Sequence, residues 1–88
     1  MSEPTRVYRF AVNVTPKPGI LDPQGKAVED SLKHLGFGVD GARVGRVVDL
    51  EVAESDPEQA RAEVERMCAE LLANPLIESY EIELAEGS

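Results

Sequence analysis

The side chains that most often perform catalysis are scarce in this chain. It contains one histidine, His34, and one cysteine, Cys68. With one of each, the chain cannot build a His-pair metal site or a Cys–His clamp. His34 falls in the last turn of a predicted helix, where positive charge suits the helix dipole, and Cys68 falls on an apolar helical stripe. We therefore expect no catalytic residue, no metal ligand and no bound cofactor in this chain.

The charged side chains exclude further classes of function. The chain has 17 acidic and 9 basic side chains, which give a net charge of −8. Such a surface repels phosphate backbones and anionic membranes, so neither nucleic acid nor a membrane is an expected partner. The carboxylates are spread over helix faces and strand backs, and no pair is placed across a cleft for acid–base chemistry. Neither a G-x-x-x-x-G-K phosphate loop nor a G-x-G-x-x-G turn is present.

Three stretches remain as candidate contacts for a partner, and the first is Gly19–Gly25, which reads GILDPQG. Its aspartate is a good N-cap for a helix, and the proline that follows suits the first helical position. Its last glycine allows another backbone or a ligand to come close. The apolar pair before the cap and the glutamine after it exceed what a cap needs. The candidate contact residues are Leu21, Asp22, Pro23, Gln24 and Gly25.

The second stretch is Arg43-Val44-Gly45-Arg46, at the start of a predicted strand. Arg46 has the parity of the apolar face of that strand. Either a bulge at Gly45 turns its side chain outward, or its guanidinium pairs with an acid at a chain boundary. The candidate contact residues are Arg43, Gly45 and Arg46.

The third stretch, Leu71-Leu72-Ala73-Asn74-Pro75, ends a predicted helix. Asn74 cannot continue the helix easily, because the residue before a proline is displaced from the α region. The same stretch can form a surface corner that presents apolar and amide groups to a partner. Asn74 and Pro75 are therefore also candidate contacts.

Five predicted elements must position these stretches. Strands are predicted over 7–14, 43–53 and 77–84, and helices over 23–35 and from 57 to the Asn74-Pro75 stop. In the first strand, Tyr8, Phe10, Val12 and Val14 share one face, as a strand with one buried face requires. The second strand is about 35 Å long if straight, and its protruding end offers unpaired backbone groups to another chain.

The order strand, helix, strand, helix, strand predicts an α+β fold. The economical arrangement is a small antiparallel sheet of about three strands with both helices on one face, related to the ferredoxin-like fold. We expect residues 1–88 to form one domain, with an ordered core over about 6–85 between two short tails. The sequence shows no signal peptide, no apolar run near the roughly 20 residues of a membrane span, and one cysteine, so we expect a cytoplasmic protein.

Taken together, several segments resemble the PurS family, the small subunits of phosphoribosylformylglycinamidine (FGAM) synthase. The similar segments are Gly19–Gly25, Leu35-Gly36-Phe37, Arg43–Arg46, Met67-Cys68, Leu71–Pro75, Ile77-Glu78 and Tyr80. The resemblance runs from about Val7 to Leu84, and the order and spacing of the segments make it specific. The family pattern usually has a lysine where Arg46 stands.

The resemblance implies a small α+β protein that forms homodimers or larger assemblies and has no active site of its own. It implies two further partners, a PurQ-like glutaminase and a small PurL-like synthetase, which this subunit joins. The assembled ligase hydrolyses glutamine and passes ammonia to an ATP-activated amide of formylglycinamide ribonucleotide, in de novo purine biosynthesis. ATP and magnesium are then used by the complex and not bound by this chain.

A free-standing regulatory module is the alternative hypothesis. In that case two ferredoxin-like subunits bind a small metabolite between them, as Gly25, Gly45 and the pair Arg43 and Arg46 suggest. A third option, an acylphosphatase-like enzyme, lacks an arginine-bearing phosphate loop after the first strand.

Overall fold

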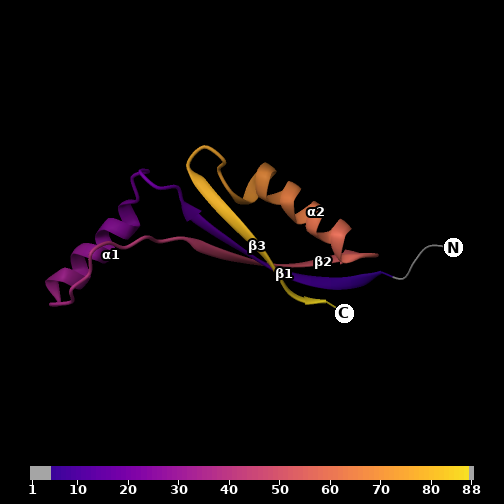
Figure 1. Cartoon of the computed structure of the whole chain (residues 1–88), viewed down its shortest axis with the longest axis horizontal. Helices are drawn as coiled ribbons and strands as arrows, with labels where there is room; N and C mark the ends of the chain where they lie inside the picture. The colour runs from indigo at the N-terminus through magenta and orange to yellow at the C-terminus, as the bar shows by residue number, and fades with distance from the viewer. Residues whose placement is uncertain (1–4, 88) are drawn as a thin grey trace.

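A computed structural model describes residues 5–87 and shows an elongated chain of α+β type (Figure 1). The elements are β1 (Arg6–Pro16), α1 (Pro23–His34), β2 (Arg46–Glu54), α2 (Pro57–Met67), the π-helical turn η1 (Cys68–Leu72) and β3 (Glu78–Gly87). Of the two predicted tails, residues 1–4 and Ser88 lie outside the described residues. The last strand is longer than predicted, because β3 continues to Gly87 and not only to residue 84.

The three strands form one antiparallel sheet in the order β2-β1-β3. The β1–β2 ladder is regular from the Val14–Arg46 pair to the Arg6–Glu54 pair. A bulge that turns Arg46 outward, one of the two predicted possibilities, is therefore absent from this ladder. The one shift of register lies between Arg9 and Phe10, on the β3 side. The predicted class, three antiparallel strands with two helices, is confirmed.

The topology requires α2 to lie along the sheet. Both β2 and β3 run antiparallel to β1, on opposite sides of it, so they run parallel to each other. A chain that joins two parallel strands must cross from one end of the sheet to the other, and a packed helix usually makes this crossover. Here α2 and η1 make it, over one face of the sheet (Figure 1).

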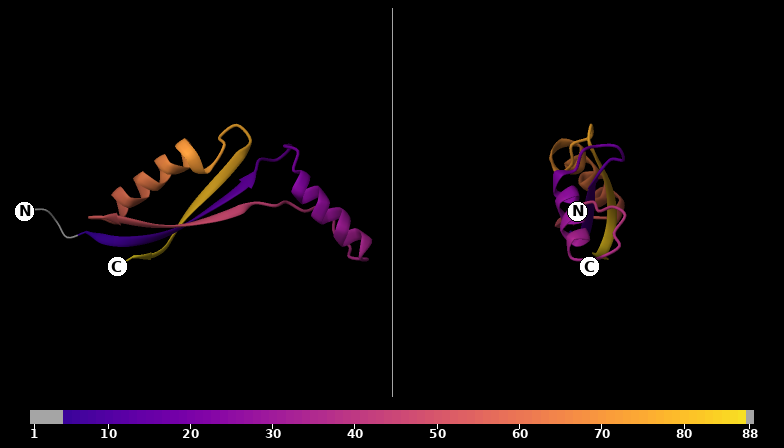
Figure 2. Two further views of the ribbon diagram at one scale, coloured as in Figure 1. Left: turned by 180° about the vertical axis from the view of Figure 1, so that it is seen from behind. Right: turned by 90° about the vertical axis from the view of Figure 1, so that its left-hand side faces the viewer.

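The same reasoning explains why α1 lies elsewhere. Because β1 and β2 are antiparallel neighbours, the chain leaves and re-enters the sheet at the same end, and a helix packed along the sheet would carry it to the wrong end. Instead α1 projects beyond that end, and the chain returns beside it to β2 (Figures 1 and 2). The expectation that both helices share one sheet face is therefore wrong for α1. The Cα radius of gyration is 17.2 Å, against about 12 Å for a compact chain of this length.

The hydrophobic core lies between the sheet and α2. The alternating residues of β1 that were predicted to face inward, Tyr8, Phe10, Val12 and Val14, are all at most 5% exposed. From α2 and η1 the core receives Ala60, Val64 and Cys68, each 0% exposed. The apolar stripe of α1 is not part of this core, since Val28 is 41% and Leu35 70% exposed.

Both helices begin as predicted from their Asp-Pro pairs. The carboxylate of Asp22 accepts the Gly25 N–H at 3.0 Å, and that of Asp56 accepts the Gln59 N–H at 2.9 Å. A proline fills the first turn in each case. Among residues 5–87, no helix has the length and apolar character needed to cross a membrane.

Candidate functional site

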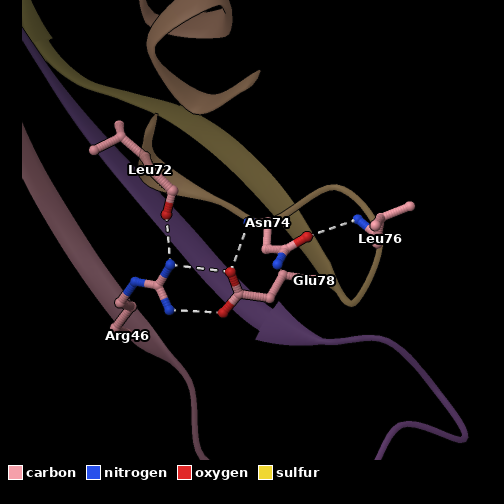
Figure 3. A network of polar contacts seen from close by, with 5 residues as sticks. All are labelled: Arg46, Leu72, Asn74, Leu76 and Glu78. Carbon is pink, nitrogen blue, oxygen red and sulfur yellow. Dashed lines mark hydrogen bonds and ion pairs between the residues drawn. The ribbon is translucent and has the colours of Figure 1, made fainter. Parts of the chain in front are cut away.

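The first feature of the site is an ion pair between the two outer strands, at the end of the sheet nearest α1. Arg46, the first residue of β2, binds Glu78, the first residue of β3, through two bonds: Nη1 to Oε2 at 2.7 Å and Nη2 to Oε1 at 3.1 Å. The same guanidinium donates to the carbonyl of Leu72 (Figure 3). Arg46 therefore pairs with an acid, as one prediction held, but with an acid of its own chain.

Glu78 also holds the turn between η1 and β3. Its Oε1 accepts the backbone N–H of Asn74 at 2.7 Å, and the Asn74 side chain accepts the N–H of Leu76 at 3.0 Å (Figure 3). The Arg46 guanidinium, together with the Asn74 N–H, holds the pKa of the Glu78 carboxyl below its ordinary value. We call these four residues, Arg46, Leu72, Asn74 and Glu78, the corner cluster.

The corner cluster joins two stretches that the sequence had singled out separately. Arg46 and Asn74 meet through Glu78, which was not among the predicted contact residues. A signal for it existed, because Glu78 has the same parity as the apolar residues of its strand, just as Arg46 has on β2. Two opposite charges at inward-facing positions of strands on either side of β1 are well placed to pair.

The stretch Gly19–Gly25 fixes α1 to the chain segment that enters β2. While one carboxylate oxygen of Asp22 caps the helix, the other accepts the N–H of Val44 at 2.9 Å. These two N–H groups, from Gly25 and then Val44, hold the pKa of Asp22 below its ordinary value, and the charge of Arg43 lowers it further. The stretch therefore sets the position of the α1 arm.

Two predicted glycines are explained by close contacts inside the chain. A Cβ at Gly25 would collide with the Asp22 carboxylate and with the carbonyl of Ala42. A Cβ at Gly45 would collide with the carbonyl of Val14. Atoms of the chain itself therefore approach both glycines closely. Since Arg46 is also engaged within the chain, the observations that suggested a metabolite-binding module have an internal explanation.

A hollow of about 240 Å³ lies between the Gly19–Gly25 stretch and the corner cluster. It brings together six of the predicted contact residues, namely Leu21, Asp22, Pro23, Gln24, Gly45 and Arg46, with Ile20, Ile77 and Glu78 among the other residues that line it. Arg43, Gly25, Asn74 and Pro75 are not part of its lining.

The loops on the two sides of the hollow are tied to each other. Lys17 donates its backbone N–H to the carbonyl of Ile77 at 2.9 Å and its Nζ to the carbonyl of Pro75 at 2.6 Å. Around this tie the chain presents large apolar side chains to solvent: Leu21 and Leu76 are each 82% exposed. Ile20 and Ile77, which line the hollow, are exposed as well, and such a group of exposed apolar side chains is typical of a contact surface.

The potentially reactive groups lie away from this surface. Cys68 is buried against the sheet, and this burial raises the pKa of its thiol, with a smaller contribution from Glu65. His34 is exposed at the end of α1. Within residues 5–87, no three His, Cys, Asp or Glu side chains are grouped to hold a metal ion. The site therefore consists of the hollow, the exposed apolar side chains around it and the turn that Glu78 holds in place.

Comparison with known proteins identifies the family. The chain matches the PurS family, described as phosphoribosylformylglycinamidine (FGAM) synthase, over residues 9–86. The PurS subunit of FGAM synthase from Synechocystis sp. is 39% identical over 84 residues, which are 92% of this chain and 84% of that protein. The PurS crystal structure from Thermotoga maritima has a TM-score of 0.82 at 34% identity and covers 89% of this chain and 91% of its own. A chain of the PurLQS structure from the same organism matches with a TM-score of 0.82 at 34% identity, over 89% of this chain and 96% of that one. The fold and the sequence agree, and this chain belongs to the PurS family.

Proposed function

We propose that this chain is the assembly subunit of FGAM synthase and joins a glutaminase to a synthetase in de novo purine biosynthesis. The observation that carries the proposal is the match to a chain of the Thermotoga maritima PurLQS structure, at a TM-score of 0.82 over 96% of that chain. The proposal includes a cytoplasmic location, in agreement with the single cysteine.

The reaction explains why such a subunit is needed. The glutaminase releases ammonia from glutamine, and the synthetase adds it to an ATP-activated amide of formylglycinamide ribonucleotide. Protonation to ammonium removes the nucleophilic lone pair, so the two sites must be held together and shielded from water. ATP and magnesium belong to the larger subunits in this proposal, and this chain supplies no reacting atom.

The contacts divide between two regions of the chain. The hollow, with Leu21 and Leu76 beside it, serves as the contact for a larger subunit, because its apolar side chains are exposed on a backbone that Lys17, Asp22 and Glu78 fix. The chain also associates with itself, since its elongated shape leaves apolar side chains such as Leu35 and Phe37 exposed, and a second copy can cover them.

The experiment that tests this proposal is co-purification of the three components. A PurQ-like glutaminase, a small PurL-like synthetase and this chain, mixed with glutamine and ATP, are expected to elute as one complex in size-exclusion chromatography. A double variant, Leu21→Asp with Leu76→Asp, is expected to elute separately from the two enzymes. The proposal would be overturned if the two enzymes elute together in the absence of this chain and this chain elutes separately from both.

A further inference from the structure

Positive charge gathers around the hollow, in a chain that is otherwise acidic. The segments that meet there are residues 16–25, 43–46 and 71–78. Their charged side chains give a net charge of +1: the basic Lys17, Arg43 and Arg46, and the acidic Asp22 and Glu78. Because the whole chain carries −8, the other residues carry −9. An acidic partner is therefore attracted to the hollow and repelled by the rest of the chain.

The two carboxylates at the hollow are already engaged within the chain. Both oxygens of Asp22 accept backbone N–H groups, from Gly25 and from Val44. Both oxygens of Glu78 accept the Arg46 guanidinium, and one of them also accepts a backbone N–H. Neither carboxylate is thus free to pair with the other cations around the hollow.

Those other cations keep donors for a partner. Lys17 directs its Nζ to the carbonyl of Pro75, which carries no net charge. Among residues 5–87, Arg43 is exposed and makes no ion pair. Arg46 uses Nη1 and Nη2, which leaves its Nε–H without a partner in the same part of the chain. Carboxylates of a partner are the natural acceptors for these groups.

The apolar side chains at the hollow define the other half of the partner's chemistry. Ile20 and Ile77 line it, and the exposed leucines Leu21 and Leu76 lie beside it. Its volume of about 240 Å³ gives room for a bulky apolar side chain. Such an anchor in a pocket, with charged groups at the rim, is typical of the centre of a protein interface.

The charges argue against a second copy of the chain at the hollow. If two copies met here about a two-fold axis, Lys17 and Arg43 of both copies would be brought together, which like-charge repulsion disfavours. The proposed self-association uses Leu35 and Phe37, at the other end of α1, about 18 Å from Pro23 for a helix of this length. The hollow is thus left for a larger subunit.

The acidic remainder of the chain does not prevent such a contact. At physiological ionic strength the screening length is about 8 Å, whereas the described chain extends over 62 Å along its longest axis. The charges next to the hollow therefore act on a docked segment more strongly than the acids at the far end of the sheet.

We propose that the hollow receives an acidic and apolar segment of one of the larger subunits. A bulky apolar side chain of that segment enters between Ile20 and Ile77, and neighbouring Asp or Glu side chains pair with Lys17 and Arg43. The inference rests on the proposed function and specifies the chemistry of the partner at its contact surface.

The first test measures the Kd of the chain for the mixed glutaminase and synthetase. Arg43→Glu is expected to raise the Kd by about tenfold or more, because repulsion replaces attraction at the rim of the hollow. The matched control is Arg66→Glu, which changes the net charge by the same amount on α2, where Arg66 is 78% exposed. It is expected to leave the Kd nearly unchanged. Equal effects of the two variants overturn the proposal.

The same titration at high salt tests whether charge is the cause. The ratio of the Arg43→Glu Kd to the wild-type Kd is expected to approach one between about 0.1 M and about 1 M salt, because the screening length falls from about 10 Å to about 3 Å. A ratio that does not change with salt overturns the pairing with carboxylates.

The second test identifies the occupant with a carbodiimide, which joins a lysine amine directly to a carboxylate in contact with it. In the mixture of the three proteins, Lys17 is expected to be linked to an Asp or Glu of a larger subunit, identified by mass spectrometry. Lys26, which lies 3.2 Å from Asp30 of its own helix, is the control and is expected to be linked within the chain. Links from Lys17 to a second copy, or none to a larger subunit, overturn the proposal.

The outcomes also separate this inference from the proposed function. A wild-type chain that never elutes with the glutaminase and the synthetase contradicts both. A wild-type chain that elutes with them, while Arg43→Glu binds as tightly as Arg66→Glu, contradicts the acidic segment alone, and the joining of the two enzymes stands.

Discussion

The guanidinium of Arg46 binds both carboxylate oxygens of Glu78, at 2.7 Å and 3.1 Å, and so links the starts of the two strands that flank β1. These residues are 32 positions apart in the sequence. Because Glu78 also holds the Asn74 N–H, the ion pair fixes the turn that presents Leu76 to solvent. The pair thus connects the end of the sheet to the proposed contact surface.

Arg46→Glu is expected to impair assembly more than folding. It replaces the ion pair by two neighbouring carboxylates and releases the turn, but the core under α2 is not touched. Glutamine-dependent turnover of the reconstituted complex is expected to fall by about tenfold or more, while Tm falls by less than about 4 °C. Arg46→Lys, which keeps the charge, is the control. Parallel losses of Tm and turnover would argue that the arginine is purely structural.

The Arg46–Glu78 pair also predicts a dependence of stability on acid pH. The folded-state pKa of Glu78 lies below its ordinary value of 4.5. Its contribution to stability is therefore complete above that value and is lost as the pH falls through the lowered folded-state pKa. Glu78→Gln is expected to flatten the acid side of a plot of Tm against pH, whereas Glu81→Gln, on the exposed face of β3, serves as the control. An unchanged acid slope in Glu78→Gln would contradict this role.

Asp22→Ala is expected to loosen the α1 arm without unfolding the body. It removes the acceptor of both the Gly25 and the Val44 N–H groups. Hydrogen exchange at these two amides is expected to accelerate, with little change in Tm, because α1 is not part of the core. The matched change at the α2 cap, Asp56→Ala, is expected to lower Tm, since α2 covers the core. Equal effects of the two variants on Tm would show that α1 stabilises the isolated chain.

Gly45→Ala is expected to destabilise the sheet end. Its new methyl group would collide with the carbonyl of Val14, so β1 and β2 must separate locally. We expect a loss of about 1–3 kcal/mol in the free energy of unfolding, measured by urea titration. Gly38→Ala, where nothing lies within 4 Å of the new atom, is the control and is expected to be nearly neutral. A neutral Gly45→Ala would contradict the account of this glycine.

The sequence predicted most of the elements because their signals are local. Alternation placed Tyr8, Phe10, Val12 and Val14 in the core, and the caps at Asp22 and Asp56 located both helix starts. The position of α1 could not be predicted in this way. The spacing of Val28 and Leu35 shows that the helix needs an apolar neighbour, but it does not show in which molecule that neighbour lies.

The site was predicted in part for a similar reason. The stretches around Asp22, Arg46 and Asn74 were identified separately, because each has a local peculiarity. The stretches around Asp22 and Arg46 line one hollow, and Arg46 meets Asn74 through Glu78. Both relationships depend on the strand order β2-β1-β3, which places the start of β2 and the start of β3 on opposite sides of β1. Glu78 was missed because its partner is distant in the sequence, and only the shared inward parity points to it.

The central claim, that this chain contributes assembly and no chemistry, is tested most directly by comparing two nitrogen sources in the reconstituted enzyme. Synthetase and glutaminase are assayed for FGAM formation with glutamine or with ammonium chloride, each with and without this chain. We expect omission of the chain to abolish turnover with glutamine and to reduce turnover with ammonia far less. Turnover with glutamine that is the same in the absence of the chain would contradict the account.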